Sequence, residues 1–170
     1  SQGEPLVGDA TQSSIQTAFK VATKIAKDLG SADADNVDAF YTFETDSDAV
    51  SGKSAGAAMT LATIALLTGR EENNGVLVTG TIEEDESIGI VSGVLEKAKA
   101  ARQYNYTTIL VPAGTSQAVK QEQVCERQQQ EFTTITRCQT KSVPVDIASE
   151  VGITVIEISN IKQAVEYALK

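Results

Sequence analysis

Residues 54–67 constrain the fold of this chain more than any other stretch, because most of their side chains are Ala, Leu, Ile or Met. A helix that is apolar around its whole circumference must be covered by other elements. We therefore expect a buried helix that ends at Thr68-Gly69, since glycine is a common helix stop. The 170 residues are enough to bury such a helix in a single domain, residues 1–170.

Apolar periodicity predicts the other elements around this helix. Helices are expected over 12–29, 93–101, 146–151 and 161–169, and strands over 37–43, 76–78, 88–91, 107–111 and 153–158. Residues 31–36 and 45–53 are expected to be loops, and 83–86 an acidic turn. The polar, Gln-rich stretch 117–140 is interpreted as a surface helix plus an excursion. The alternation predicts an α/β (α+β) fold with a mixed sheet and helices packed against it.

Composition excludes several classes of function. The net charge is −9 with no basic cluster, so the phosphate backbone would repel the chain and no nucleic-acid partner is expected. There is no His and there are only two Cys, which excludes Ser-His-Asp and Cys-His sites and zinc sites built on His or four Cys. No metal is expected. The general base of a hydrolase would have to be Lys, Asp, Glu or an amine.

The two cysteines, Cys125 and Cys138, lie in the same polar segment. A disulfide between them would indicate an oxidising compartment. The alternative is two unpaired thiols in a cytoplasmic protein. A membrane-associated or extracytoplasmic location is slightly favoured over a cytoplasmic one.

Ser54 lies where a loop enters the expected buried helix, within Ser51-Gly52-Lys53-Ser54-Ala55-Gly56. In one interpretation its side chain only caps the helix. In the other, Ser54 is a nucleophile, and the backbone at Gly52, Lys53 and Ala55 holds an oxyanion and the substrate backbone, aided by the helix dipole.

Gly52-Lys53-Ser54 also resembles the end of a phosphate-binding P-loop. That motif needs Gly at position 47, where this chain has Ser47. Asp46 and Asp48 would repel phosphate, so a nucleotide site is disfavoured.

Several further blocks, in a fixed order, resemble the proteolytic domain of the Lon protease family. They are Gln12-Ser13-Ser14-Ile15-Gln16-Thr17-Ala18, Ser54-Ala55-Gly56, Leu67-Thr68-Gly69, Val78-Thr79-Gly80, the run 93–101 around Lys97, and Thr108-Ile109-Leu110-Val111-Pro112. No gap is needed between Ser54 and Pro112. Lys97 follows Ser54 by 97 − 54 = 43 positions, the spacing of the family's catalytic pair.

The resemblance implies a serine endopeptidase that forms an acyl-enzyme with Ser54 as nucleophile and Lys97 as general base. It also implies that the Thr79 hydroxyl supports the lysine. Two simpler alternatives stay open. Thr79 could bond only to backbone at a strand end, and Lys97 could be a surface lysine paired with Glu96 or Asp85. A latent, non-catalytic binding or assembly module is the alternative for the whole chain.

The chain departs from the family pattern at Ser51-Gly52-Lys53, where D-G-P is common, and at Ser92-Gly93, where two glycines are usual. Asp48 is a candidate for the missing carboxylate. The family's first strands and ATPase module are not in this sequence, so ATP would matter only through a separate module, and no cofactor is expected here. The resemblance implies polypeptide substrates and a homo-oligomer, a hexamer in the family. An ATPase module or membrane anchor would lie outside this chain.

Overall fold

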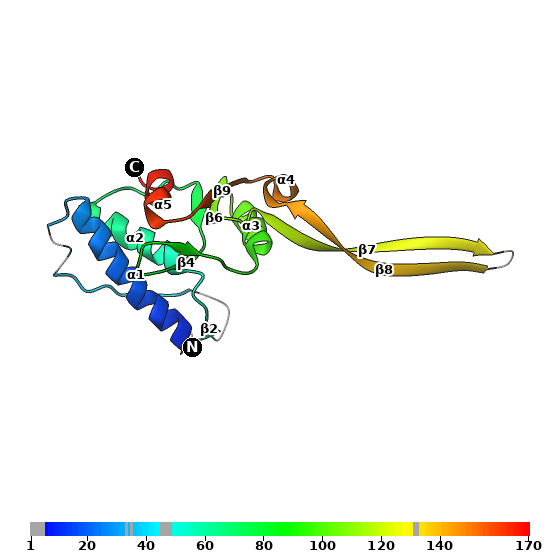
Figure 1. The fold of residues 1–170 in the computed structure, drawn as a ribbon, viewed down its shortest axis with the longest axis horizontal. Helices are drawn as coiled ribbons and strands as arrows, with labels where there is room; N and C mark the ends of the chain where they lie inside the picture. The colour runs from blue at the N-terminus through cyan, green and yellow to red at the C-terminus, as the bar shows by residue number, and fades with distance from the viewer. Residues whose placement is uncertain (1–5, 33, 35, 45–48, 131–132) are drawn as a thin grey trace.

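The computed structural model describes every residue except 1–5, 33, 35, 45–48 and 131–132 (Figure 1). The helices in this part of the chain are α1 (Asp9–Asp28), α2 (Gly56–Thr68), α3 (Val94–Gln103), α4 (Ile147–Val151) and α5 (Ile161–Ala168). The strands are β1 (Leu6–Val7), β2 (Ala49–Val50), β3 (Val76–Val78), β4 (Thr81–Ile82), β5 (Ile88–Gly89), β6 (Thr108–Pro112), β7 (Gln117–Gln130), β8 (Thr133–Asp146) and β9 (Thr154–Ile158). The predicted α/β class is confirmed.

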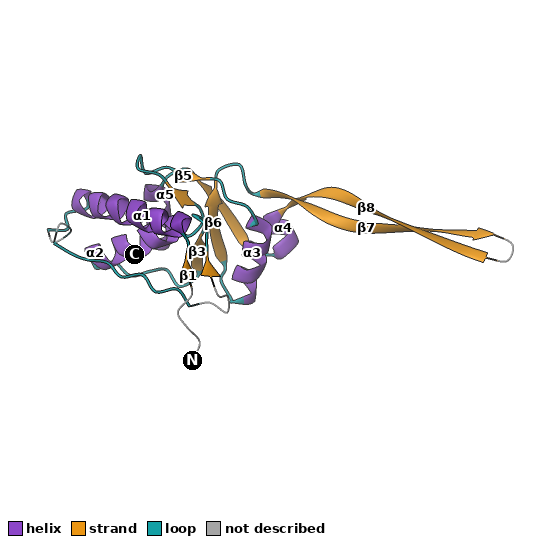
Figure 2. Cartoon of the chain, turned by 90° about the horizontal axis from the view of Figure 1, so that it is seen from below, coloured by secondary structure: helices purple, strands orange, loops and turns teal. Residues whose placement is uncertain are grey.

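A parallel sheet of order β3-β6-β9 forms the middle layer of the body. Successive side chains of a strand point to opposite faces. Accordingly Leu110 of β6 joins the core formed with α1, α2 and α5, whereas Ile109 and Val111 join a second core formed with α3 and α4. All three side chains are fully buried. Helices therefore cover both faces of the sheet, as parallel strands require (Figure 2).

Helix α2 lies against α1 and α5 and is largely buried, as its composition predicts. Its buried side chains include Met59, Leu61 and Ile64, although Leu66 remains 83% exposed. Gly69 adopts a left-handed conformation with φ of 66° and ends the helix at the expected position. The helix is followed by β3, which carries the backbone back into the sheet.

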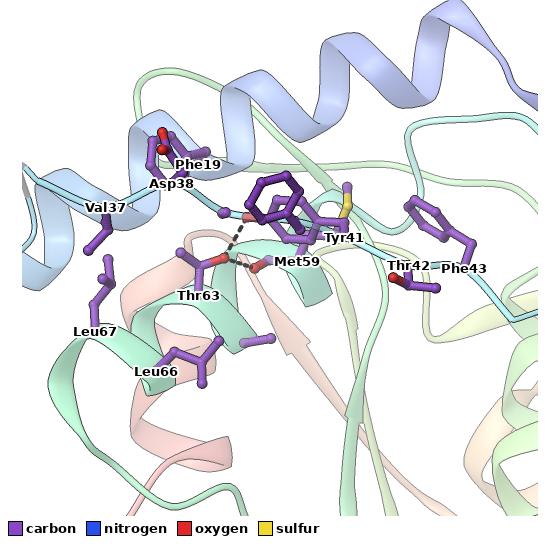
Figure 3. Close-up of a pocket in the computed structure, with 13 residues that line it drawn as sticks. Phe19, Val37, Asp38, Tyr41, Thr42, Phe43, Met59, Thr63, Leu66 and Leu67 are labelled. Carbon is purple, nitrogen blue, oxygen red and sulfur yellow. Dashed lines mark hydrogen bonds between the residues drawn. The ribbon is translucent and has the colours of Figure 1, made fainter.

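The expected strand over 37–43 does not form. The segment forms no strand pairing with any described residue, so it lacks the ladder that defines a strand. Tyr41 and Phe43 instead pack against the core of α1 and α2, and the Tyr41 hydroxyl lies 2.6 Å from Thr63 Oγ1. Phe40 is 94% exposed. The segment also lines a pocket of about 520 Å³, together with Phe19 of α1 and with residues of α2 (Figure 3). Within the neighbouring loop, positions 45–48 lie outside the described residues.

The expected surface helix within 117–140 is wrong, because this stretch belongs to a long antiparallel hairpin. Strands β7 and β8 pair from Gln117↔Asp146 to Gln130↔Thr133, and a Cys125–Cys138 disulfide joins them. The hairpin projects away from the body (Figures 1 and 2). The β-branched Thr, Ile and Val residues of β8 favour strand structure, and the residues of β7 pair with them.

Of the expected strand 88–91, only Ile88–Gly89 pairs. No helix in the described residues is both long and apolar enough to span a membrane.

Candidate active site

Ser54 lies in the tight turn that leads into α2. The turn follows Gly52, whose φ of 122° is one that residues with a side chain rarely adopt. The N-cap of α2 is Ala55, and no side chain caps this helix. Among the described residues, none forms a hydrogen bond with the Ser54 hydroxyl, which is therefore available for chemistry.

Two buried hydroxyls of α1 hold the loop before Ser54. Thr11 Oγ1 donates to the Gly52 carbonyl at 3.0 Å and lies 3.5 Å from the Val50 carbonyl. Ser14 Oγ donates to the Lys53 carbonyl at 3.5 Å. Both residues are less than 5% exposed. The sequence analysis missed them, although polar residues on the buried face of an amphipathic helix are a detectable signal.

The end of β3 holds the backbone of Ser54 from the other side. The Ser54 carbonyl accepts a hydrogen bond from the Gly80 N–H at 3.1 Å and one from Thr79 Oγ1 at 3.3 Å. The Ala57 N–H donates in return to the Gly80 carbonyl at 3.1 Å. A Cβ atom at Gly80 would clash with the side chain of Ile88, so glycine is needed where the end of β3 meets the Ser54 turn.

Several backbone N–H groups next to Ser54 in the sequence have no partner among the described residues. The N–H groups of Gly52, Lys53, Ser54 and Ala55 donate no hydrogen bond to any described residue, while the Gly56 N–H is already used by the Lys53 carbonyl. These unpaired groups lie at the N-terminus of α2, where the helix dipole favours negative charge. An oxyanion formed on a carbon bonded to Ser54 would find donors of the kind that stabilise tetrahedral intermediates.

Gly56 shows why small residues follow Ser54. A Cβ atom at this position would lie 2.8 Å from Ser14 Oγ and 2.9 Å from the backbone nitrogen of Ile82. Both contacts are closer than real Cβ atoms make, so only glycine allows α2 to begin this close to α1 and β4. The turn that carries Ser54 is therefore built by packing on three neighbouring elements.

Lys97 occupies the first turn of α3, and its side chain is half-buried. Its Nζ donates to the Ser92 carbonyl at 2.8 Å and forms no salt bridge with a described residue. Burial lowers the pKa of Lys97 below its ordinary value, and the negative charge of Glu96 opposes this effect only in part. The carboxylate of Asp85 is bonded by Ser87 instead. An amine with a lowered pKa is neutral, and so basic, at a lower pH.

The predicted site residues are therefore only partly connected. Thr79 is hydrogen-bonded to the backbone of Ser54, whereas the amine of Lys97 is held by Ser92. In the described part of the chain, no hydrogen bond joins Lys97 to either Ser54 or Thr79. Asp48 lies outside the described residues. Cys125 and Cys138 lie in the hairpin, and neither takes part in the contacts described above for Ser54.

Comparison with known proteins agrees with the order of these elements. The family model of the Lon protease (S16) C-terminal proteolytic domain matches residues 4–146. A Lon protease from Methylocella silvestris is 31% identical over 109 residues, which is 63% of this chain and 14% of that protein. The chain thus spans only a small part of the length of this relative. The residues that the family model matches include α1, the Ser54 turn, Thr79 and Lys97, and the chain belongs to the Lon protease family, through its C-terminal proteolytic domain.

Proposed function

We propose that this chain is a serine endopeptidase domain in which Ser54 is the nucleophile and Lys97 the general base. The Ser54 turn carries the proposal, because it places a hydroxyl and several N–H groups that have no partner among the described residues at the start of α2. The lowered pKa of Lys97 supports it, because a Lys can accept a proton only when its amine is neutral. The order of the family motifs and their spacing from Ser54 to Lys97 support the same assignment. Membership of a protease family supports the reaction class.

The proposed reaction begins when neutral Lys97 takes the proton from Ser54 Oγ as that oxygen attacks a peptide carbonyl. Protonated Lys97 then gives the proton to the leaving amine, which leaves an acyl-enzyme on Ser54. Water resolves the ester by the same route. The N–H groups at Lys53, Ser54 and Ala55 would stabilise the oxyanion, at about 3 kcal/mol for each donor.

The hydrogen bond from Lys97 to the Ser92 carbonyl defines what must change before this reaction can occur. The amine has to exchange its Ser92 partner for the Ser54 hydroxyl. The proposal requires that rotation about the side-chain bonds of Lys97 brings its amine to the Ser54 hydroxyl. Thr79, now bonded to the Ser54 carbonyl, is proposed to support the amine once it has moved.

Polypeptides are the proposed substrates, and a homo-oligomer is the proposed working form. Any dependence on ATP would come from a separate module, because Gly52-Lys53-Ser54 lacks the glycine of a P-loop. These statements follow from family membership and from the charge and motif content of this chain.

Labelling with an activated phosphonate probe, which phosphonylates a reactive serine oxygen and loses its leaving group, tests the dyad. The variants Ser54→Ala and Lys97→Met should each lose labelling and hydrolysis of an unfolded polypeptide by roughly a thousandfold or more, because each removes a reacting group. Met keeps the apolar length of the lysine without its amine. The matched control is Lys99→Met on the exposed side of the same helix, which should stay within about twofold of the wild type.

Undiminished labelling in Lys97→Met would remove Lys97 from the mechanism. A latent binding module is the second candidate, and the Lys97–Ser92 hydrogen bond is the observation that favours it. A latent module would bind unfolded polypeptide without labelling or hydrolysis, and Ser54→Ala would leave that binding unchanged.

A further inference from the structure

The two faces of the β7–β8 hairpin differ in chemistry. We call residues 121–129 and 134–142 the outer arm. One face, which we call the charged face, exposes Glu122, Glu126, Arg137 and Lys141 together with Val124, Gln128, Gln139 and Ile135. Six of these side chains line a shallow hollow of about 100 Å³, which places them on the same side of the ladder. The other face carries the disulfide, the single charged residue Arg127 of β7, and otherwise Gln, Ser and Thr.

The charges on the charged face are sorted by strand. Both acidic side chains, Glu122 and Glu126, come from β7, and both basic ones, Arg137 and Lys141, come from β8. The pairing register sets Glu122 opposite Lys141 and Glu126 opposite Arg137. Neither pair forms a salt bridge among the described residues. Glu122 Oε1 does lie 3.6 Å from Lys120 Nζ, in the same strand just before the outer arm, and both side chains are partly exposed. On its charged face the outer arm therefore has an acidic edge and a basic edge, and these exposed charges can meet another molecule.

Both edges also offer unpaired backbone groups. No third described strand pairs with β7 or β8. The Cα atoms of Cys125 and Cys138 are 4.0 Å apart, the close spacing of a non-hydrogen-bonded pair. The backbone groups of these residues and of every second residue along each strand therefore point outward. An exposed edge of this length is a template for a further strand.

We infer that the outer arm joins further copies of this chain edge to edge, with β7 of one copy beside β8 of the next and all arms pointing the same way. This arrangement places Glu122 and Glu126 against Arg137 and Lys141 of the neighbour. On the charged face, a two-fold contact of β7 with β7 would instead bring acidic side chains together, and one of β8 with β8 would bring basic side chains together. Opposite charges across strands stabilise a sheet, and like charges destabilise it.

The same arrangement satisfies the backbone. The outward-pointing residues of β7 and those of β8 have matching alternation, so a neighbour at the same height, or shifted by two residues, forms a regular antiparallel ladder. The contact uses different surfaces on its two sides, so repetition produces a closed ring or an open chain of copies. The inference does not depend on the proposed peptidase function.

Charge reversal tests this contact in the 170-residue chain. The variants E122K/E126K and R137E/K141E each give both edges the same sign. Sedimentation at low salt should show the wild type above the 18.0 kDa mass of one chain and each variant alone at that mass. An equimolar mixture of the two variants should associate again, because each then offers the opposite charge to the other. The control Q123K/Q129K adds charge on the other face and should associate like the wild type.

Circular dichroism and the intact disulfide establish that each variant is folded, so that loss of association reports on the contact. Reassociation of the mixture supports the inference independently of any effect of one variant on its own arm. The inference is overturned by a wild type that stays at the mass of one chain. Reversal variants that associate like the wild type, or folded variants that fail to associate when mixed, overturn it as well.

Discussion

The body and the outer arm of this protein are held together by different forces. In the body, Leu110 of the central strand is completely buried between helices, whereas Ile135 in the arm is 38% exposed. A two-stranded hairpin without a core is marginally stable in water. The arm keeps its shape through its ladder and the Cys125–Cys138 disulfide. One chain thus combines a part that folds by burying apolar surface with a part that needs a covalent link.

The buried core ends and the exposed hairpin begins where β7 and β8 leave the body, which we call the root of the hairpin. Ala118 and Val145 pack against the core of α3 and α4. Lys120 Nζ lies 2.6 Å from Glu150 Oε1 of α4. Beyond these contacts, the side chains of the arm face solvent. Substitutions on either side of this root should therefore have different consequences.

Removing a buried side chain should show the largest difference between the two parts. Leu110→Ala leaves a cavity in the body and should reduce the free energy of unfolding by about 2–5 kcal/mol. Ile135→Ala, in the arm, should cost less than about 1 kcal/mol, because the side chain is already partly in water. Urea unfolding followed by circular dichroism measures both. Equal losses would mean that the arm has a core of its own.

Removing the disulfide should affect the arm alone. Closing a loop with 13 residues of separation between the cysteines stabilises the arm by about 3 kcal/mol. The double variant Cys125→Ser/Cys138→Ser should therefore show fast amide hydrogen exchange along 121–142 and unchanged exchange in α2 and β6. Reducing the wild type with a dithiol should reproduce this pattern. Faster exchange in β6 would contradict the separation of the two parts.

The pH dependence of catalysis should belong to the body. The rate should rise about tenfold per pH unit while the base is protonated. It should level off below pH 10.5, the ordinary value for lysine, since burial lowers the pKa of Lys97. The disulfide variant should have the same profile with a small peptide substrate. A profile that changes with the arm would show that the arm reaches the site.

Surface ion pairs should have the smallest effect. Glu86 in the body accepts Lys24 at 2.6 Å and Lys162 at 2.9 Å, and these hydrogen bonds lower the pKa of Glu86. Their contribution is therefore present above pH 4.5, the ordinary value, and is lost as pH falls through the lower folded pKa. Glu86→Gln should lower the melting temperature at pH 7 by less than about 3 °C.

The matched change in the arm is Glu126→Gln, which should leave the melting temperature of the body unchanged because Glu126 forms no salt bridge with a described residue. Calorimetry at pH 7 and at pH 3 distinguishes the two variants. At pH 3 the difference between Glu86→Gln and the wild type should shrink. A difference that grew on acidification would contradict the assigned sign.

Two segments, 37–43 and 117–140, show where sequence analysis fails. Residues 37–43 have strand-forming side chains but no neighbouring strand, so Tyr41 and Phe43 pack on helices instead. Residues 117–140 are polar, yet they form most of the longest ladder, because β7 finds a partner in β8. Strand propensity describes how a side chain fits a sheet and not whether a partner is present. Pairing is decided at a distance along the chain.

The residues of the candidate site also differ in whether the sequence could indicate them. Ser54, Lys97 and Thr79 were predicted as site residues from the order of the motifs and, for the first two, from a spacing of 43 positions, and their roles stay predictions. Thr11 and Ser14, which hold the loop before Ser54, were not named, since their role depends on α1 lying against that loop. The partner of each side chain became clear only from the folded contacts.

The sequence by itself determined the α/β class, the buried character of α2 and the chemistry available to a site without His. These properties follow from composition and from periodicities of a few residues, which act locally. Only the tertiary structure decided that Lys97 is held by the Ser92 carbonyl, that Thr79 contacts the Ser54 backbone, and that a Gln-rich segment becomes a two-edged arm. Each of these contacts joins residues that are not neighbours in the sequence, and tertiary packing decides which of them come into contact.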